Sequence, residues 1–104
     1  MSVIEEVAAE RKRQIDVEGW SADHDAEHDG GVLAKAAISY AAHACAGLEI
    51  PQHDPVKYRA ISQPRSWPWD TKWWKPKTPR RDLIRSAALI VAEIERLDRS
   101  QKPL

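Results

Sequence analysis

The chain has 104 residues, the size of one domain, and leaves no room for two separate hydrophobic cores. Sixteen Lys and Arg side chains balance sixteen Asp and Glu side chains, so no global basic excess attracts nucleic acid, which we do not expect as a partner. Hydrophobic residues make up 42% of the chain without forming a long apolar run, which excludes a membrane-spanning helix.

The first predicted helix covers residues 2–17. Ser2 lies three residues before Glu5, the spacing of a capping box, and Gly19 follows the last predicted turn. Five residues recur at helical spacing and form a stripe that we expect to be buried: Ile4, Val7, Ala8, Arg11 and Ile15. The charged residues Glu5, Glu6, Glu10, Lys12 and Arg13 fall largely outside this stripe.

The second predicted helix covers residues 31–46 and is rich in alanine. Its expected buried face consists of Leu33, Ala36, Ala37, Tyr40, Ala41 and Ala44. Gly47 is placed to cap the carboxyl end, and Cys45 is expected to be a small buried residue. His43 is expected to be a packed or surface histidine rather than a base. One cysteine forms no internal disulfide, and without a signal-peptide pattern we expect a cytoplasmic protein.

A long loop, residues 48–77, contains most of the prolines and tryptophans, with a turn of helix predicted at residues 57–61. Thr78 and Pro79 then form a strong start signal for a third helix, residues 79–99. Its apolar stripe consists of Leu83, Ile84, Ala87, Ala88, Val91, Ile94 and Leu97. The expected fold is a single all-α domain over residues 1–104, a three-helix bundle with a long Pro/Trp-rich loop between helices 2 and 3. Because such a core is small, we expect a homo-oligomer.

Two sets of residues have metal-ligand spacing. His24, Asp25 and His28 share one face if the segment is helical, and imidazoles with carboxylates suit Zn, Mn or Fe, whereas Mg prefers carboxylates and water. Glu6 and Glu10 are four residues apart and are candidates to join that site. The alternative reading of both sets is a solvated surface, with acidic residues favouring a helix start.

The strongest functional signal is a cluster of aromatic and basic residues before and within the third helix. Four tryptophans are interleaved with five cations: Trp67, Trp69, Trp73 and Trp74 with Lys72, Lys75, Lys77, Arg80 and Arg81. Flat rings and cations suit a nucleotide base and its phosphates, and the helix start offers further N–H donors. Alternatively the indoles cover the alanine-rich helices, and we expect at least two of the four to be structural.

A set of motifs covers nearly the whole chain: Glu10-Arg-x-x-Gln14, Gly19-Trp-Ser-x-x-His-Asp-x-x-His28, Leu33-Ala-x-Ala-Ala37 with Tyr40-Ala41, Trp67-Pro-Trp-Asp70 with Trp73-Trp-Lys-Pro76, Arg80-Arg-Asp-Leu83 and Ala92-Glu-Ile-Glu-Arg-Leu-Asp-Arg99. As a set, these motifs resemble those of a family of small phage and prophage proteins without a settled activity. More remotely, the chain is similar to the all-α, Mg-dependent nucleoside triphosphate pyrophosphatases of the MazG type. That similarity implies oligomerisation and carboxylate ligands, matched by Glu6 and Glu10 on one helix and Glu93 on another. The alanine helix departs from it, with Val32, Ala36 and Ala37 where such enzymes tend to carry acids.

Three functional hypotheses follow. The first is a phage-type protein that binds a nucleotide or nucleotide-derived signal through Trp67, Trp69, Trp73, Trp74, Lys75, Arg80 and Arg81, and sequesters a defence signal in the host cytoplasm. The second is a nucleotide pyrophosphatase that holds Mg, Mn or Zn with Glu6, Glu10, Asp25 and His28. The third is a module that binds a host protein through its tryptophans. Whether the chain is an enzyme stays open at this level.

Overall fold

The computed structural model describes residues 1–18, 31–49 and 54–100. Within these ranges the chain forms helices and connecting loops and has no strand, which confirms the all-α fold. The elements are α1 (Val3–Glu18), α3 (Val32–Leu48), α4 (Pro55–Ala60), the 3-10 helix η2 (Thr71–Trp73) and α5 (Pro79–Ser100). No helix in the described part of the chain is both long and apolar enough to cross a bilayer.

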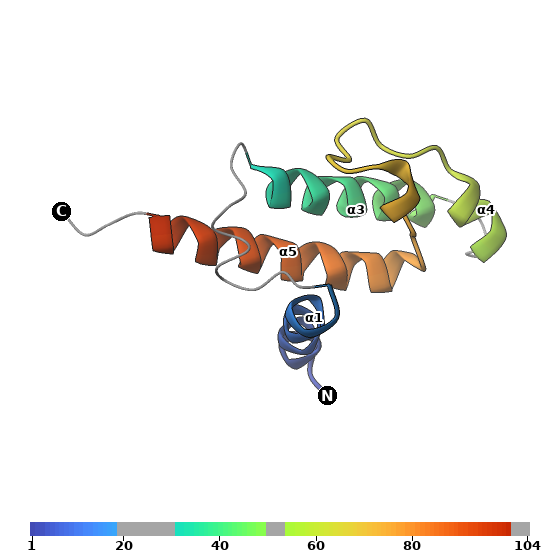
Figure 1. The fold of residues 1–104 in the computed structure, drawn as a ribbon. Coiled ribbons are helices and arrows are strands. Elements are labelled where there is room, and N and C mark those ends of the chain that lie inside the picture. Colours follow the sequence, from blue (N-terminus) through green and yellow to red (C-terminus); the bar gives the residue numbers. More distant parts are fainter. Residues whose placement is uncertain (19–30, 50–53, 101–104) are drawn as a thin grey trace.

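The layers are simple. Helices α3 and α5 run side by side in opposite directions, and α1 crosses beneath α5 at a steep angle (Figure 1). The segment between α4 and α5 passes back over α3 and contains η2 (Figure 1). In the part of the predicted loop that the structure describes after residue 53, there are two short helices, α4 and η2, and α4 lies at the predicted turn of helix.

Local sequence signals define the starts of α1 and α5 as predicted. The Ser2 N–H donates to Glu5 Oε1 over 3.1 Å, and the Glu5 N–H donates to Ser2 Oγ over 3.1 Å, which confirms the capping box. At the start of α5, Thr78 Oγ1 accepts from the Arg81 N–H at 3.1 Å. The predicted start at Pro79 is therefore confirmed, because Thr78 satisfies a first-turn donor and Pro79 has none to satisfy.

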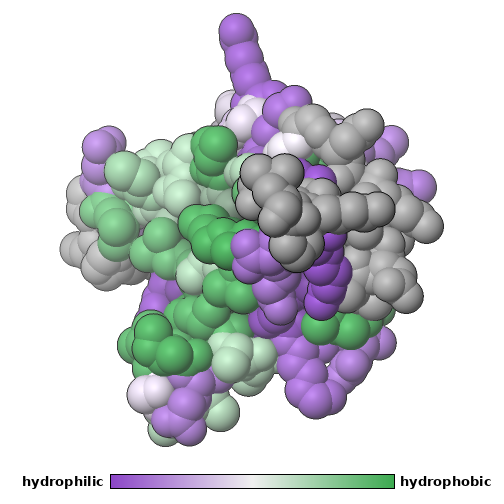
Figure 2. Space-filling view, turned by 90° about the vertical axis from the view of Figure 1, so that its left-hand side faces the viewer, coloured by the Kyte–Doolittle hydropathy of each residue, from purple (hydrophilic) through white to green (hydrophobic). Residues whose placement is uncertain are grey.

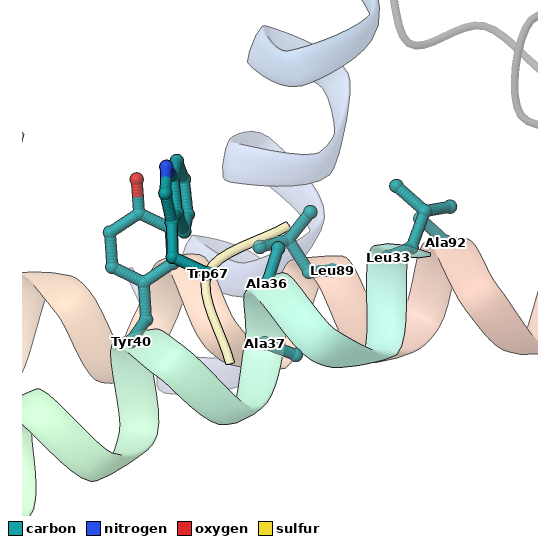
Figure 3. Close-up of a cluster of buried hydrophobic side chains, with 7 residues drawn as sticks. All are labelled: Leu33, Ala36, Ala37, Tyr40, Trp67, Leu89 and Ala92. Carbon is teal, nitrogen blue, oxygen red and sulfur yellow. The ribbon is translucent and has the colours of Figure 1, made fainter. Parts of the chain in front are cut away.

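The hydrophobic core lies between α3 and α5. It is closed by the segment that carries Trp67, Trp69 and Trp74, which we call the tryptophan loop. Its buried members are Leu33, Ala36, Ala37, Tyr40, Trp67, Leu89 and Ala92. Figure 3 shows the small alanines of α3 between the two helices and the Trp67 ring beside Tyr40 at one end. Alanines let the two helix backbones approach closely but bury little area each, so the indole supplies the bulk that α3 lacks.

The buried face predicted for α1 is largely wrong, since only Arg11 of its five residues is buried and Val7 is half-buried. Ile4 is 78% exposed, and Ile15 and Ala8 are also exposed, whereas the polar residues Glu10 and Gln14 are buried. The reason is a set of partners on α5 that helical periodicity does not reveal. These ion pairs join Glu6 to Arg80, Glu10 to Arg81 and Arg11 to Glu95. Helix α1 therefore docks largely through its polar side.

The stripe predicted for α5 is also only partly correct. Ile84 and Ala88 are buried, together with Leu89 and Ala92, but Leu83, Val91, Ile94 and Leu97 are exposed. Two sets of apolar residues therefore lie on different faces of this helix. The sequence pattern predicts one stripe that includes residues of both faces, since both sets have helical spacing.

Two residues at the end of α3 differ from their predicted roles. Gly47 is no terminal cap, because it lies inside a helix that continues to Leu48, where Glu49 is the C-cap. A Cβ atom at Gly47 would lie 2.2 Å from the Tyr58 ring, so close approach of that ring explains the glycine. Cys45 is exposed rather than buried.

Candidate ligand site at the start of helix α5

A cavity of about 300 Å³ lies where α3, α4 and α5 meet. Its lining residues are Gly47, Leu48, Pro55, Tyr58, Lys77, Thr78, Pro79 and Arg80. Carbon atoms form most of its wall, and two of the lining residues carry a positive charge. Its volume lies at the lower end of the range for small-molecule sites in proteins.

The cations at this cavity belong to a basic segment, since residues 71–81 contain five Lys and Arg and no carboxylate. Arg80 donates from Nη1 and Nη2 to the Glu6 carboxylate at 2.9 and 2.6 Å. This hydrogen bond and the charge of Arg80 lower the pKa of Glu6, and the same contact raises the pKa of Arg80. Because the pair is largely exposed, a ligand phosphate is able to compete for the guanidinium.

A buried carboxylate fixes the position of the basic segment. Asp82 is completely buried, and its Oδ2 accepts from the Tyr58 hydroxyl at 2.6 Å and from the Lys77 N–H at 3.0 Å. Arg85 Nη1 donates to Asp82 Oδ1 at 3.0 Å and to the Lys75 carbonyl at 2.8 Å. Burial, followed by the bond to Asp82, raises the pKa of Tyr58. The network therefore joins α4, the loop and α5 around the cavity.

Arg85 extends this network to α3. Its Nη2 donates to the Tyr40 hydroxyl at 2.6 Å, and its guanidinium carbon lies 4.3 Å from the centre of the Tyr40 ring. A cation over an aromatic face is attracted by the ring electrons. Arg85 thus links the buried carboxylate of Asp82 to Tyr40 in the aromatic core.

The backbone donors expected for a phosphate at the α5 start are mostly occupied. Thr78 Oγ1 takes the Arg81 N–H, the Thr78 carbonyl takes the Asp82 N–H, and Asp82 takes the Lys77 N–H. The Asp82 carboxylate also satisfies the positive end of the helix dipole. Recognition of an anion at this cavity would therefore depend on the side chains of Lys77 and Arg80.

The tryptophans lie mainly against α3 rather than around the cavity. Trp67 is buried and Trp69 and Trp74 are partly buried against the core, which confirms the packing interpretation for these three. Trp74 stacks on Tyr40 at 5.0 Å between ring centres, and Trp67 meets Trp74 edge to face at 4.8 Å. Trp73 is 60% exposed, with Lys72 Nζ 5.2 Å from its ring centre. None of the four lines the cavity.

The remaining predicted cations differ in their surroundings. Lys75 is exposed on the loop, and its carbonyl holds Arg85. Arg81 is half-buried and pairs with Glu10 on α1, so it lies on the other side of the α5 start from the cavity. Of the five cations in the predicted cluster, the structure therefore brings Lys77 and Arg80 to the cavity wall.

Of the predicted metal ligands, His24, Asp25 and His28 lie outside the described residues. Burial alone would raise the pKa of Glu10, but hydrogen bonds and charges from Arg13 and Arg81 hold it below its ordinary value. Glu6 and Glu10 do line a second hollow of about 270 Å³, together with Arg13 and Arg81. No group of three or more His, Cys, Asp or Glu side chains with metal-site geometry occurs within residues 1–18, 31–49 and 54–100.

His43 is a packed histidine. Its Nε2 lies 3.0 Å from the Tyr58 carbonyl and must carry the proton, since a carbonyl only accepts. Its ring also contacts the Tyr58 and Trp74 rings, at 4.5 and 5.2 Å between centres. Burial lowers the pKa of His43, and the Tyr58 carbonyl and the Asp82 charge offset this only in part. This confirms the expectation that His43 is a packed residue.

The pH dependence of stability tests this environment. Because the folded pKa of His43 lies below the unfolded value of about 6.5, its contribution is complete above that pH and is lost as the pH falls. We expect the melting temperature to fall between about pH 7.5 and 5.5, and His43→Gln to reduce that fall, because its amide can donate to Tyr58 without titrating. If the melting temperature fell with pH equally in both proteins across this range, the result would contradict the environment assigned to His43.

Sequence reasoning missed most of the cavity. No sequence motif marks the wall residues Gly47, Leu48, Pro55 and Tyr58. They form a cavity only because the fold places them against the start of α5. One local signal existed, because a glycine near the end of an alanine-rich helix is typical of close packing as well as of capping. Comparison of the chain with protein-family models, with curated proteins and with solved structures finds no match.

Proposed function

We propose that this protein binds a small anionic molecule with an aromatic ring, and that a nucleotide is the class that fits best. The observation that carries the proposal is the cavity of about 300 Å³ whose carbon-rich wall ends at Lys77 and Arg80. A base fits the wall formed by Leu48, Pro55 and Tyr58, and phosphates need fixed cations. Both requirements meet at one place.

The proposed site differs from the tryptophan-lined site expected from sequence. The ring-binding surface is the apolar wall of the cavity, and none of the four tryptophans belongs to it. A charge-assisted hydrogen bond contributes about 1.5–3 kcal/mol, so two cations with an apolar wall are compatible with micromolar affinity.

We favour binding over hydrolysis. The carboxylates that a metal-dependent pyrophosphatase would need on α1, Glu6 and Glu10, are ion-paired with Arg80, Arg13 and Arg81. A metal would have to displace these arginines before it could activate water. The role we propose is therefore capture of a nucleotide or nucleotide-derived signal.

Calorimetric titration with a panel of nucleotides, nucleosides and inorganic phosphate, with and without Mg²⁺, tests the proposal. We expect nucleotides to bind, nucleosides and phosphate alone to bind more weakly, and Lys77→Ala with Arg80→Ala to reduce affinity about tenfold or more. The matched control is Lys35→Ala with Arg65→Ala, which removes one lysine and one arginine charge from exposed positions away from the cavity.

Chromatography of the ligand after incubation completes the test. Unaltered ligand supports capture, whereas turnover would replace it with the hydrolase alternative. An equal loss of affinity in the control pair would contradict the cavity as the site. Failure of every nucleotide to bind would refute the proposed function itself.

A further inference from the structure

Helix α5 has an apolar stripe that its own chain leaves exposed. Leu83, Ile90, Ile94 and Leu97 are 43%, 49%, 52% and 39% exposed, and Ala87 lies half-buried between them. The spacing from Leu83 to Leu97 alternates between four and three residues, which is the spacing of a seam between two packed helices. The stripe spans about 21 Å along the helix.

This stripe is a third face of α5, distinct from the two that dock α3 and α1. Arg85 and Ser86 point to α3, where they bond the Tyr40 hydroxyl and the Ala37 carbonyl. Arg81 and Glu95 point to α1, where they pair with Glu10 and Arg11. In the space-filling view, hydrophobic surface extends down one side of the molecule, from the level of α3 and α5 to the level of α1 (Figure 2).

We propose that a second copy of the chain covers this stripe, with the two α5 helices antiparallel about a two-fold axis near Ile90. Leu83 and Leu97 lie equally far from Ile90 along the sequence, so an antiparallel pair brings each leucine opposite the other and Ile90 opposite itself. Such a surface is self-complementary, as a two-fold interface requires.

The charges beside the stripe select the antiparallel orientation. Arg80 and Asp98 lie about five turns apart, and therefore on the same side of α5, one near each end of the stripe. Antiparallel pairing places Arg80 beside Asp98 of the second copy at both ends. Parallel pairing would place like charges together, which is destabilising.

The net charge also favours a second copy as the occupant. The formal charge of the chain is zero, so two copies do not repel each other at neutral pH. Within the described ranges, α3 and α1 cover only some of the apolar side chains of α5 and leave the others exposed. This is typical of a subunit whose core continues across an interface.

Sedimentation velocity across the micromolar concentration range tests the proposal. We expect a dimer of twice the 11.8 kDa chain mass, and a monomer for the double variant Ile90→Lys with Ile94→Lys. The matched control is Ile38→Lys, because Ile38 is a similarly exposed isoleucine on α3, at 57%, and should leave the dimer intact. A wild-type monomer at every concentration, or equal dissociation of the control, would overturn the proposal.

Cysteine cross-linking tests the orientation and does not depend on the lysine variant folding. In a Cys45→Ser background, Ile90→Cys is expected to cross-link with itself. Leu83→Cys and Leu97→Cys are expected to cross-link mainly when the two proteins are mixed. Self-cross-linking of Leu83→Cys as efficient as that of Ile90→Cys would instead assign a parallel pair and overturn the proposed arrangement.

The proposed dimer and the proposed ligand site share Arg80, but the stripe residues Ile90 and Ile94 do not line the cavity. The cavity residues come from α3, α4 and the start of α5 of one chain. The double lysine variant is therefore expected to bind nucleotide as the wild type does, and loss of dimerisation and loss of binding are separately measurable.

Discussion

Replacing Asp82 by Asn is expected to lower the free energy of unfolding by about 3 kcal/mol, the largest effect of a single isosteric change that we predict. Asp82 is fully buried and accepts hydrogen bonds from Tyr58, Lys77 and Arg85. An amide of the same shape removes the negative charge opposite Arg85 and presents N–H groups to donors. A buried cation and a buried donor then lose their partner, which costs more than the pair contributes when intact.

Urea unfolding followed by circular dichroism measures this change. The matched control is Asp16→Asn, the same chemical change in an exposed carboxylate that pairs with Lys12 within α1. An exposed ion pair contributes little, so the control should leave the unfolding midpoint nearly unchanged. Similar midpoints for Asp82→Asn and the control would contradict the role assigned to the Asp82 network.

The second large effect is expected from Gly47→Ala. We expect this change to lower the free energy of unfolding, whereas a change from glycine to alanine inside a helix usually raises it. Alanine inside a helix is normally about 1 kcal/mol more favourable than glycine. Here the added Cβ would lie 2.2 Å from two carbon atoms of the buried Tyr58 ring and 3.2 Å from Pro79 Cγ. Relief of this overlap requires movement of α4 or of the helix end, and we expect a net loss of about 2–3 kcal/mol.

A double-variant cycle with Tyr58→Ala separates steric overlap from other effects. Once the ring is removed, the alanine at position 47 keeps only the milder contact with Pro79 Cγ at 3.2 Å, so most of its cost should disappear. Thermal or urea unfolding of the four proteins gives the coupling. A stabilising effect of Gly47→Ala in the wild-type background would show that the ring does not approach Gly47 as described.

The local elements of the fold were predictable from sequence because their signals are local. Ser2 with Glu5, and Thr78 with Pro79, satisfy helix-end donors within four residues, and the structure contains both arrangements. The buried face of α3 was also predictable, because α3 has a single dominant apolar face between the tryptophan loop and α5.

The faces of α1 and α5 were not predictable in the same way. Helical spacing identifies apolar stripes but not whether the chain itself covers them. On α1 the stripe containing Ile4 is exposed, because arginines more than 70 positions later hold the polar side. On α5, two apolar faces have the same helical spacing, so the sequence pattern does not distinguish the buried face from the exposed one.

The candidate site was predictable in its chemistry more than in its geometry. The basic segment and the start of α5 carried a clear signal, and Arg80 does reach a cavity. The wall of that cavity depends on the contact between Gly47, Tyr58 and Pro79, which are distant in sequence. The tryptophans carried the strongest compositional signal, yet three of them supply core volume that the alanines of α3 lack.

The most direct test of the central claim is nuclear magnetic resonance of the ¹⁵N-labelled protein during titration with a nucleotide. We expect the largest shifts of backbone amide signals at Gly47, Leu48, Tyr58, Thr78 and Arg80, around the cavity at the start of α5. Shifts confined to α1 around Glu6 and Glu10, or no shifts at saturating nucleotide, would contradict that claim.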